Sequence, residues 1–190
     1  DKRSTPPISG RAAARNAPLR GTLPPVRPSR LSHILILVPD VPAAVAFYEA
    51  TLGLRLSDKS GDVVAFTHAM HGSDHHLIAF AKANGTGLHH SSWDVPTIDD
   101  IGLGARQMQA AGYERGWGVG RHVLGSNYFY YVRDPWGSYA EYSFDIDYIP
   151  EGMDWQPTSP PEDNSFYLWG PNPPEDFTRN YELMPNSKLY

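Results

Sequence analysis

The middle of the chain contains an internal repeat, and this repeat restricts the folds that the sequence can adopt. The stretches "LSHILILVPDVPAAVAFYEATLG" (31–53) and "LHHSSWDVPTIDDIGLGARQMQAAG" (88–112) both begin Leu-x-His. In both, a Val follows the aligned His after five residues, and a run with helical spacing then leads to a Gly. A repeated unit of this length cannot bury its apolar face alone. We therefore expect two similar halves that pair and share one core.

Each copy carries the signals of one helix. In the first copy Asp40 and Pro42 are typical of a helix start, and in the second copy Thr97 precedes Asp100 by three residues, the spacing of a capping box. The Gly that closes each copy, for example Gly53, suits the left-handed position after a helix. Apolar residues recur on one face of each expected helix: Val45, Tyr48 and Leu52 in the first, and Ile98, Ile101, Ala105 and Met108 in the second.

Strand-like stretches follow each expected helix. They cover residues 63–70 and 75–82 in the first half and residues 128–134 and 138–144 in the second. Each half therefore reads β-α-β-β-(β), which indicates an α+β fold in which the two halves share one sheet core.

The regions outside the repeat differ from it in composition. Residues 1–30 are rich in Pro, Arg, Gly and Ala, and we expect an arm or linker there. The folded domain is expected over 31–149, with modules at about 31–86 and 87–149. Residues 150–190 are rich in Pro but also in aromatic side chains, which are costly to leave in water. We expect this tail to pack on the domain or on a neighbouring subunit, and hence a homo-oligomer.

Composition narrows the function classes. A formal net charge of −5 provides no basic surface for nucleic acid or anionic lipid. No run approaches the roughly 20 apolar residues of a membrane span, and the first residues do not resemble a signal peptide. A cytoplasmic enzyme or binding protein is the expectation. With eight His and no Cys, a metal site would use nitrogen and oxygen ligands, which suit iron, manganese, zinc or nickel.

The repeat also selects candidate metal ligands. His90, not His89, is the counterpart of His33, and neighbours on a strand point to opposite faces, so only one of the two adjacent histidines should serve a site. Glu141 lies in an otherwise neutral strand, where a buried carboxylate needs a partner. A lone strand histidine is usually a hydrogen-bonded core residue, so the prediction depends on the repeat. His33, His90 and Glu141 would form a 2-His-1-carboxylate set that suits Fe(II) and leaves positions open for substrate and O2.

The same residues lie in motifs that resemble those of the vicinal-oxygen-chelate (glyoxalase/bleomycin resistance/dioxygenase) superfamily. The likeness covers residues 31–146 and is strongest to the type I extradiol ring-cleavage dioxygenases. The stretch from "LSHILILV" resembles their first-strand motif, "LHHSSWDV" their LHHxxFxx strand, and "DPWGSYAEYS" their DPxGxxxEx hairpin. The resemblance implies paired βαβββ modules that form a curved mixed sheet around Fe(II), or Mn(II), bound by His33, His90 and Glu141.

The resemblance implies catalytic roles for three more residues. "HLIAF" resembles a strand whose His is the acid/base, which assigns that role to His76, although the spacing to the ligand His is one position short and His75 stays an alternative. The intervals from His122 to Tyr131 and on to Glu141 match those of the family. Tyr131 would hydrogen-bond a substrate oxygen, and His122 would stabilise its negative charge.

Other aromatic and histidine residues are less clearly assigned. Trp93 and Phe129 are expected to wall a substrate pocket, although such residues more often belong to a core. His68, His71 and His75 are expected to be solvated hairpin residues.

The resemblance implies an enzyme of aromatic hydrocarbon catabolism, similar to catechol 2,3-dioxygenase or 2,3-dihydroxybiphenyl 1,2-dioxygenase, that cleaves a small aromatic diol with O2. One alternative is a glyoxalase-like isomerase, but Ala79 stands where glyoxalase I has a fourth ligand. The other is an aromatic ligand- or drug-binding protein, and such proteins generally lack the metal residues. Many extradiol enzymes carry a metal-free copy of the paired module upstream. Either this chain is a one-domain form, or the upstream half is absent from it.

Overall fold

The computed structural model describes residue 19 and residues 22–183. Most of the expected N-terminal arm and the last residues of the tail lie outside these described residues. The first half of the fold contains β1 (Arg30–Val38), α1 (Val41–Leu52), β2 (Leu54–Ser60), β3 (Val64–Ala69), β4 (Ser73–Asp74) and β5 (Ile78–Lys82). The second half contains β6 (Gly87–Asp94), α2 (Ile98–Ala110), β7 (Gly116–His122), β8 (Tyr128–Arg133) and β9 (Tyr139–Phe144). After it come β10 (Tyr148–Ile149), α3 (Glu162–Ser165), β11 (Tyr167–Trp169) and the 3-10 helix η1 (Tyr181–Leu183).

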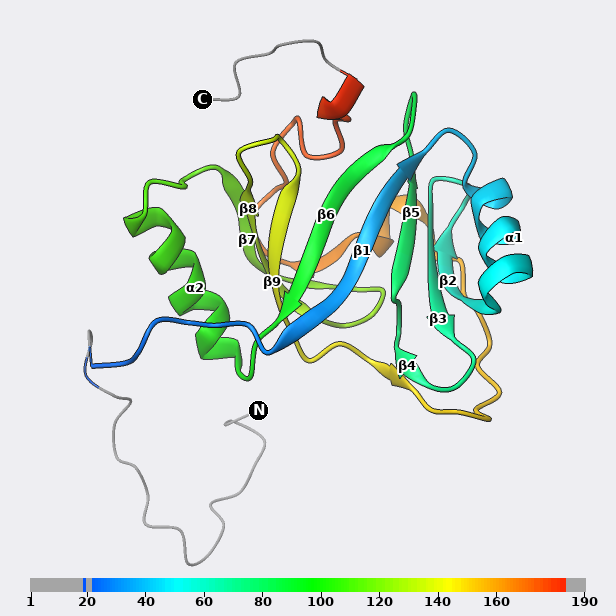
Figure 1. The fold of residues 1–190 in the computed structure, drawn as a ribbon, viewed down its shortest axis with the longest axis horizontal. Coiled ribbons are helices and arrows are strands. Elements are labelled where there is room, and N and C mark those ends of the chain that lie inside the picture. Colours follow the sequence, from blue (N-terminus) through cyan, green and yellow to red (C-terminus); the bar gives the residue numbers. More distant parts are fainter. Residues whose placement is uncertain (1–18, 20–21, 184–190) are drawn as a thin grey trace, which may run out of the picture.

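Nine strands form one sheet in the order β11-β7-β8-β9-β6-β1-β5-β3-β2. The first strands of the two halves, β1 and β6, lie side by side and antiparallel near its middle (Figure 1). Each is paired on its other side, in parallel, with the last strand of its own half, β5 beside β1 and β9 beside β6. The two halves are thus related by a pseudo-twofold axis between β1 and β6. The paired βαβββ organisation predicted from the repeat is confirmed.

The two helices pack at opposite ends of the sheet, on the side that we call its outer face (Figure 1). The Asp40 side chain accepts a hydrogen bond from Ala43 N at 3.0 Å, and Gly53 ends α1 with φ of 70°. Thr97 caps α2 and donates its hydroxyl to Asp100 Oδ2 at 2.7 Å. The predicted helix signals are therefore confirmed. No helix within residues 22–183 combines the length and the apolar character that crossing a membrane requires.

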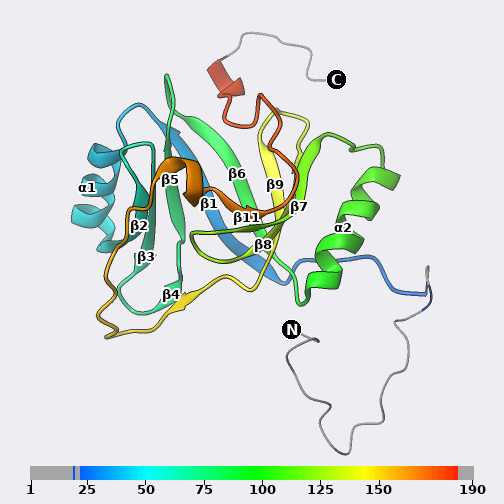
Figure 2. The same ribbon diagram turned by 180° about the vertical axis from the view of Figure 1, so that it is seen from behind.

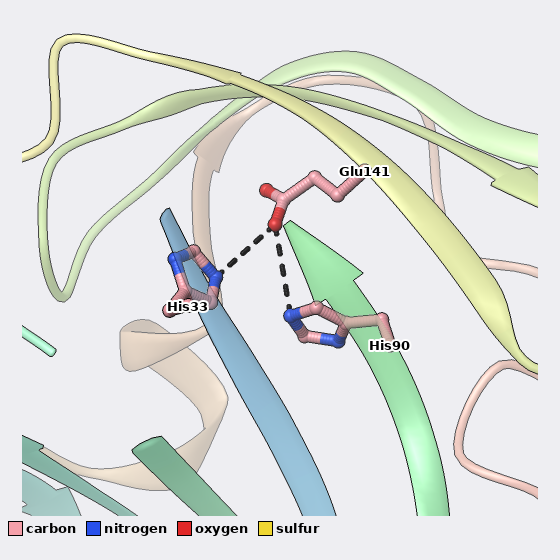
Figure 3. A group of neighbouring side chains, drawn as sticks. All are labelled: His33, His90 and Glu141. Atoms are coloured by element: carbon pink, nitrogen blue, oxygen red, sulfur yellow. Dashed lines mark ion pairs between the residues drawn. The ribbon is translucent and has the colours of Figure 1, made fainter. Parts of the chain in front are cut away.

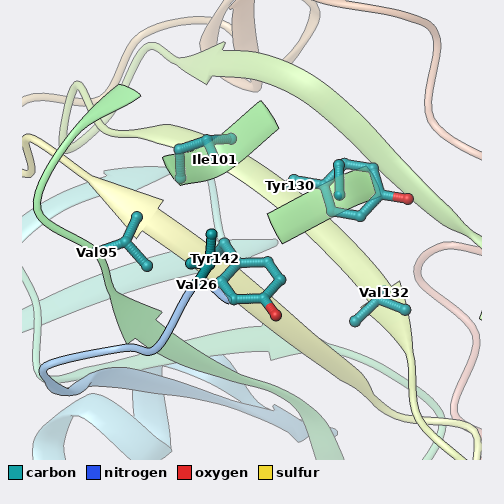
Figure 4. Close-up of a cluster of buried hydrophobic side chains, with 7 residues drawn as sticks. Val26, Val95, Ile101, Tyr130, Val132 and Tyr142 are labelled. Carbon is teal, nitrogen blue, oxygen red and sulfur yellow. The ribbon is translucent and has the colours of Figure 1, made fainter. Parts of the chain in front are cut away.

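The pleat of β8 separates the two faces of the sheet. Tyr130 packs outward with Ile101 of α2, in the cluster drawn in Figure 4. Phe129 and Tyr131 point to the opposite, inner face, where they pack with Trp117 of β7. The inner face carries the residues predicted to form the site.

The chain after β10 runs along the inner face (Figure 2). Its strand β11 pairs antiparallel with β7 and extends the sheet by one strand. Phe177 is only 4% exposed and packs against Tyr131. Trp155 Nε1 donates to the Ser57 carbonyl at 2.8 Å. This segment therefore forms one wall over the inner face instead of extending into solvent.

Candidate metal centre

Three adjacent strands bring the predicted metal ligands together. Ser92 on β6 is paired with His33 on β1 and with Glu141 on β9, so these two residues lie on either side of one strand, level with each other. His33 Nε2 lies 3.2 Å and His90 Nε2 3.6 Å from the same oxygen, Glu141 Oε2 (Figure 3). Their candidate ligand atoms all lie within 4.8 Å of one another, and all three residues are buried. The structure thus contains a metal-binding group of two His and one Glu.

Two polar atoms of this group have no hydrogen-bond partner among the described residues. They are His90 Nε2 and Glu141 Oε2, both fully buried. Leaving a buried donor or acceptor unpaired costs about 1–3 kcal/mol, and more when the group is charged. A divalent cation placed between these atoms would satisfy both, so the residues present fit a bound metal ion.

Hydrogen bonds to the far nitrogens orient both imidazoles. His33 Nδ1 lies 3.2 Å from Ser32 Oγ, whose hydroxyl donates to Asp74 Oδ2 at 3.2 Å. Because the Ser32 hydroxyl donates its proton to Asp74, the Ser32 oxygen can only accept a hydrogen bond from His33 Nδ1–H. The lone pair of this imidazole is therefore on Nε2, the atom that faces Glu141. Such contacts to the second nitrogen of a ligating His fix its tautomer and orientation.

His89 plays the same part for His90. The two Nδ1 atoms lie 2.7 Å apart, and His89 Nε2 donates to the Phe177 carbonyl at 2.7 Å. Because a carbonyl only accepts, the proton of neutral His89 is on Nε2 and its Nδ1 accepts from His90 Nδ1–H. Burial lowers the pKa of His89 to about 4, which keeps this imidazole neutral near pH 7.

The structure groups His90, not His89, with the other candidate ligands as predicted, but the expectation that His89 would point to the opposite face was wrong. The β1–β6 register shifts between the pairs Leu35–His90 and Ile36–Leu88, which leaves His89 without a partner. A β-bulge of this kind interrupts the alternation of a strand. Both His89 and His90 consequently line the same cavity.

A cavity of about 350 Å³ opens on the metal-binding group, and the three predicted catalytic residues line it. The ring of His76 lies 4.1 Å from that of His33, measured between centroids. His122 Nε2 lies 3.0 Å from the Tyr131 hydroxyl. His122 Nδ1 donates to the Phe166 carbonyl at 2.8 Å, so its Nε2 accepts the Tyr131 O–H. The structure therefore brings five of the six predicted metal and catalytic residues to one cavity, and the sixth, Glu141, lies directly behind His33 and His90.

Burial dominates the protonation states in the cavity. It lowers the pKa of His122, and it lowers that of His76 well below the ordinary value, with a further contribution from the neighbouring histidines. It also raises the pKa of the Tyr131 hydroxyl, and the Glu141 charge adds to this effect. Burial alone would raise the pKa of Glu141, but the neighbouring imidazoles of His33 and His122 outweigh it and the pKa is lowered. At neutral pH the imidazoles of His76, His90 and His122 and the phenol of Tyr131 are therefore neutral, and Glu141 is a carboxylate.

The two residues expected to wall the pocket are not among the described residues that line it. Trp93 follows Ser92 on β6 and points to the outer face, where it is 39% exposed. Phe129 is buried under His122, with the ring centroids 4.2 Å apart. The aromatic lining comes instead from Phe66 of β3, Tyr131 of β8, and Phe166 and Phe177 of the C-terminal segment.

Two of the three histidines expected to be solvated are buried. His68 and His75 are 6% and 1% exposed, whereas the His71 side chain is exposed as expected. His68 Nδ1 is hydrogen-bonded to Ser57 Oγ at 2.8 Å. Pairing of β3 with β2 covers this part of the hairpin, which explains the difference from the expectation.

Sequence reasoning also missed a residue that holds the carboxylate. Asn127 is almost fully buried, and its Nδ2 donates to Glu141 Oε1 and to Ser143 Oγ, both at 3.1 Å. It precedes β8 in the turn "LGSN", where an Asn is usually read as a turn residue. These contacts orient the carboxylate so that its second oxygen faces the histidines.

The pseudo-twofold axis identifies the counterpart of Glu141 in the first half. Ser92 follows His90 by two residues and is paired with Glu141, and Leu35 follows His33 by two residues and is paired with Ala79. Ala79 is fully buried in an apolar cluster. A methyl group therefore occupies the place where a fourth protein ligand would be expected.

Comparisons with known proteins agree with this fold. The model of the family described as the Glyoxalase/Bleomycin resistance protein/Dioxygenase superfamily matches residues 30–142. Metapyrocatechase 2 of Cupriavidus necator is 56% identical over 168 residues, which are 88% of this chain and 52% of that protein. The chain thus spans about half the length of this curated relative.

Two solved structures are similar over most of the chain. The Mn(II)-bound glyoxalase from Novosphingobium aromaticivorans has a TM-score of 0.71 at 28% identity and covers 85% of this chain and 52% of its own. Homoprotocatechuate 2,3-dioxygenase from Brevibacterium fuscum, in complex with 3,4-dihydroxyphenylacetate, has a TM-score of 0.69 at 26% identity, over 79% and 49% of the two chains. These likenesses confirm the fold that the sequence motifs implied.

Proposed function

Because the chain belongs to the Glyoxalase/Bleomycin resistance protein/Dioxygenase superfamily, we propose that it is an extradiol dioxygenase that cleaves the ring of a catechol-type diol with O2. The observation that carries the proposal is the buried group of His33, His90 and Glu141, with unpaired atoms turned toward one another beside a cavity. The high identity to metapyrocatechase 2 and the likeness to homoprotocatechuate 2,3-dioxygenase support this choice within the superfamily.

The proposed ion is Fe(II), and Mn(II) is the alternative that the likeness to a Mn(II)-bound glyoxalase supports. His33, His90 and Glu141 would hold it. A 2-His-1-carboxylate set with open positions is typical of non-haem Fe(II) oxygenases. When bound, such an ion acts as a Lewis acid that lowers the pKa of hydroxyl groups attached to it and brings two reactants together. Ala79 in place of a fourth ligand supports open positions rather than a closed protein cage.

His76 is proposed as the acid/base for the substrate. It lines the cavity beside His33, and its lowered pKa keeps it neutral and able to accept a hydroxyl proton near pH 7. The same residue would return the proton after the ring has opened. General acid–base catalysis of this kind contributes about 10²–10⁴-fold to a rate.

Tyr131 and His122 are proposed to bind the substrate oxygens. The Tyr131 proton is donated to His122, so the Tyr131 oxygen is left to accept a hydrogen bond from a substrate hydroxyl. His122 is anchored through its other nitrogen to the Phe166 carbonyl, which holds the pair in place. Negative charge that develops on the substrate would then be stabilised through this hydrogen-bonded pair.

The proposed substrates are a small aromatic diol and O2. We further propose that the protein is a cytoplasmic homo-oligomer. The C-terminal segment supports the assembly, since Leu168 and Trp169 on it are exposed although both are large and apolar. Contiguous exposed apolar residues often mark a protein contact.

The test is a ring-cleavage assay on the metal-loaded chain. The protein is loaded anaerobically with Fe(II) or Mn(II), mixed with catechol or 2,3-dihydroxybiphenyl, and then exposed to air. A yellow ring-opened product and consumption of one O2 per diol are expected. A chain that binds metal but leaves both diols intact would contradict the proposal, and isomerase activity on a glutathione adduct would favour a glyoxalase-like enzyme instead.

A further inference from the structure

The residue before the proposed acid/base is part of a buried hydrogen-bonded chain. His75 Nδ1 lies 3.0 Å from His76 Nδ1, and His75 Nε2 lies 2.7 Å from Asp58 Oδ2. Asp58 and His75 are 5% and 1% exposed, and neither is among the described residues that line the cavity. We propose that Asp58 and His75 are positioning residues that fix the tautomer of His76, so that His76 presents the lone pair of Nε2 to the cavity. This inference rests on the proposed role of His76.

The direction of the hydrogen bonds from His76 through His75 to Asp58 follows from which groups can donate a proton. Asp58 Oδ1 accepts from both the backbone N–H and the hydroxyl of Thr158, and Oδ2 faces His75. An ionised carboxylate has no proton to give, so the proton of this contact is on His75 Nε2. A neutral imidazole with its proton on Nε2 has a bare Nδ1, which accepts from His76 Nδ1–H. The free nitrogen of His76, Nε2, is then an acceptor, as a base for a substrate hydroxyl must be.

The surroundings hold His75 in this orientation. Its backbone N–H donates to the Asp147 carbonyl at 2.6 Å, and its carbonyl accepts from Ser57 Oγ. The Trp155 ring lies against it with centroids 5.7 Å apart. At Gly125 the backbone approaches so closely that a Cβ there would lie 3.3 Å from His75 Nδ1. The ring therefore has little room to turn away from His76.

The same device occurs a second time in the site. In the pair of His89 and His90 the Nδ1 atoms also face each other, and the outer nitrogen also meets a group that only accepts, the Phe177 carbonyl. In both pairs the second histidine belongs to the metal-binding or catalytic set and the first sets its tautomer. The difference is that the outer nitrogen of His75 meets a carboxylate, whereas that of His89 meets a backbone carbonyl.

The substitution Asp58→Asn tests the inference because it reverses the direction of these hydrogen bonds with little change in the shape of the side chain. The Asn oxygen can still accept from Thr158, while its NH2 group faces His75 Nε2 and donates to it. The proton of His75 then moves to Nδ1, which donates to His76, and the proton of His76 moves to Nε2. His76 would present a donor to the cavity where the wild type presents an acceptor.

The primary readout uses metal-free protein and requires no turnover. Long-range 1H–15N spectra of 15N-histidine protein, with His76 assigned from a His76→Gln variant, report which nitrogen carries the proton. We expect Nδ1–H in the wild type and Nε2–H in Asp58→Asn. In the metal-loaded enzyme we expect kcat to fall about 10²–10⁴-fold, the range for loss of a general base, with KM changed only a few-fold. In serine proteases the corresponding Asp→Asn change lowers kcat about 10⁴-fold through the wrong tautomer.

Thr158→Val is the matched control. It removes one hydrogen bond to Asp58 but keeps the carboxylate oxygen that faces His75, so the wild-type tautomer is expected. A wild-type spectrum with the proton on Nε2 of His76 overturns the inference, even if Asp58→Asn does not fold. So does an Asp58→Asn spectrum identical to that of the wild type. If the tautomers change as expected but neither the wild type nor any variant cleaves a diol, the positioning role of Asp58 and His75 is supported and the proposed function is contradicted.

Discussion

Replacing Glu141 by Gln separates the metal site from the rest of the fold. The Gln oxygen can keep the hydrogen bond from Asn127, which now reaches Glu141 Oε1 at 3.1 Å. Its NH2 group would take the position of Oε2 and offer donors to the bare Nε2 atoms of His33 and His90, 3.2 and 3.6 Å away. The substitution thus removes a buried charge and an anionic ligand while it supplies a hydrogen-bond partner for the unpaired His90 Nε2. We expect the metal-free variant to be at least as stable as the metal-free wild type.

The metal-dependent part of the stability should nearly disappear. Loss of a residue that only supports a ligand costs about 10–100-fold in metal affinity, so loss of a ligand should cost about 100-fold or more. At a metal concentration about 100 times the wild-type Kd, binding stabilises the wild type by about 2.7 kcal/mol. A variant with a Kd about 100-fold higher gains only about 0.4 kcal/mol under the same conditions. For a chain of this size the two gains correspond to shifts in Tm of about 5–11 °C and about 1–2 °C.

Thermal unfolding with and without Mn(II), or Fe(II) under anaerobic conditions, measures both gains, and a chelator should reverse them. Glu162→Gln is the matched control because Glu162 lines the same cavity but is not part of the metal-binding group. It should keep the full metal-induced shift. A Glu141→Gln protein that shows the wild-type shift would refute the ligand assignment.

Three further outcomes are expected. His76→Ala should retain bound metal, measured by elemental analysis, and lose about 10²–10⁴-fold in kcat, and an unchanged kcat would remove the acid/base assignment. His89 has a pKa of about 4 in the folded state and about 6.5 when unfolded, so the unfolded chain takes up its proton first. Its contribution to the free energy of unfolding, about 3 kcal/mol, is present above pH 6.5 and is lost as the pH falls toward 4. Urea titrations of metal-free protein at several pH values should show this loss of stability, and the loss should be smaller in His89→Gln. Phe177→Ala should lower the free energy of unfolding by about 3–5 kcal/mol, whereas Leu168→Ala, at a position 64% exposed, should change it by less than about 0.5 kcal/mol, and similar urea midpoints would argue against the packing of the tail.

The features that the sequence predicts correctly depend on residues close together in the sequence or on the internal repeat. Asp40 and Thr97 begin helices through hydrogen bonds to residues three positions away, so their role can be read from spacing. The repeat relates His33 to His90, and the neutral strand around Glu141 makes its charge conspicuous. These features depend on short-range periodicity and on the equivalence of the two halves.

The features that were missed depend on how distant segments meet. The bulge at His89 comes from the β1–β6 pairing and leaves no mark in the sequence of either strand. Asp58 and His75 are 17 residues apart in the sequence and meet only in the folded sheet. His89 is held by the backbone carbonyl of Phe177, a group that any residue type could supply. Trp93 lies outside the cavity because it follows Ser92 on β6, and the alternation of the strand turns it to the opposite face, where its partner is Tyr142.

The methyl group of Ala79 has a consequence for electroneutrality. With two imidazole ligands and one carboxylate, the metal-binding group would offer a single negative charge to a divalent ion, and one positive charge would be left over at a buried site. Uncompensated charge is expensive where water is scarce. Under the proposed function, the guest that would balance this charge is a monoanion, a requirement that a diol meets by giving up one proton and that neither an unsubstituted arene nor a dianion meets.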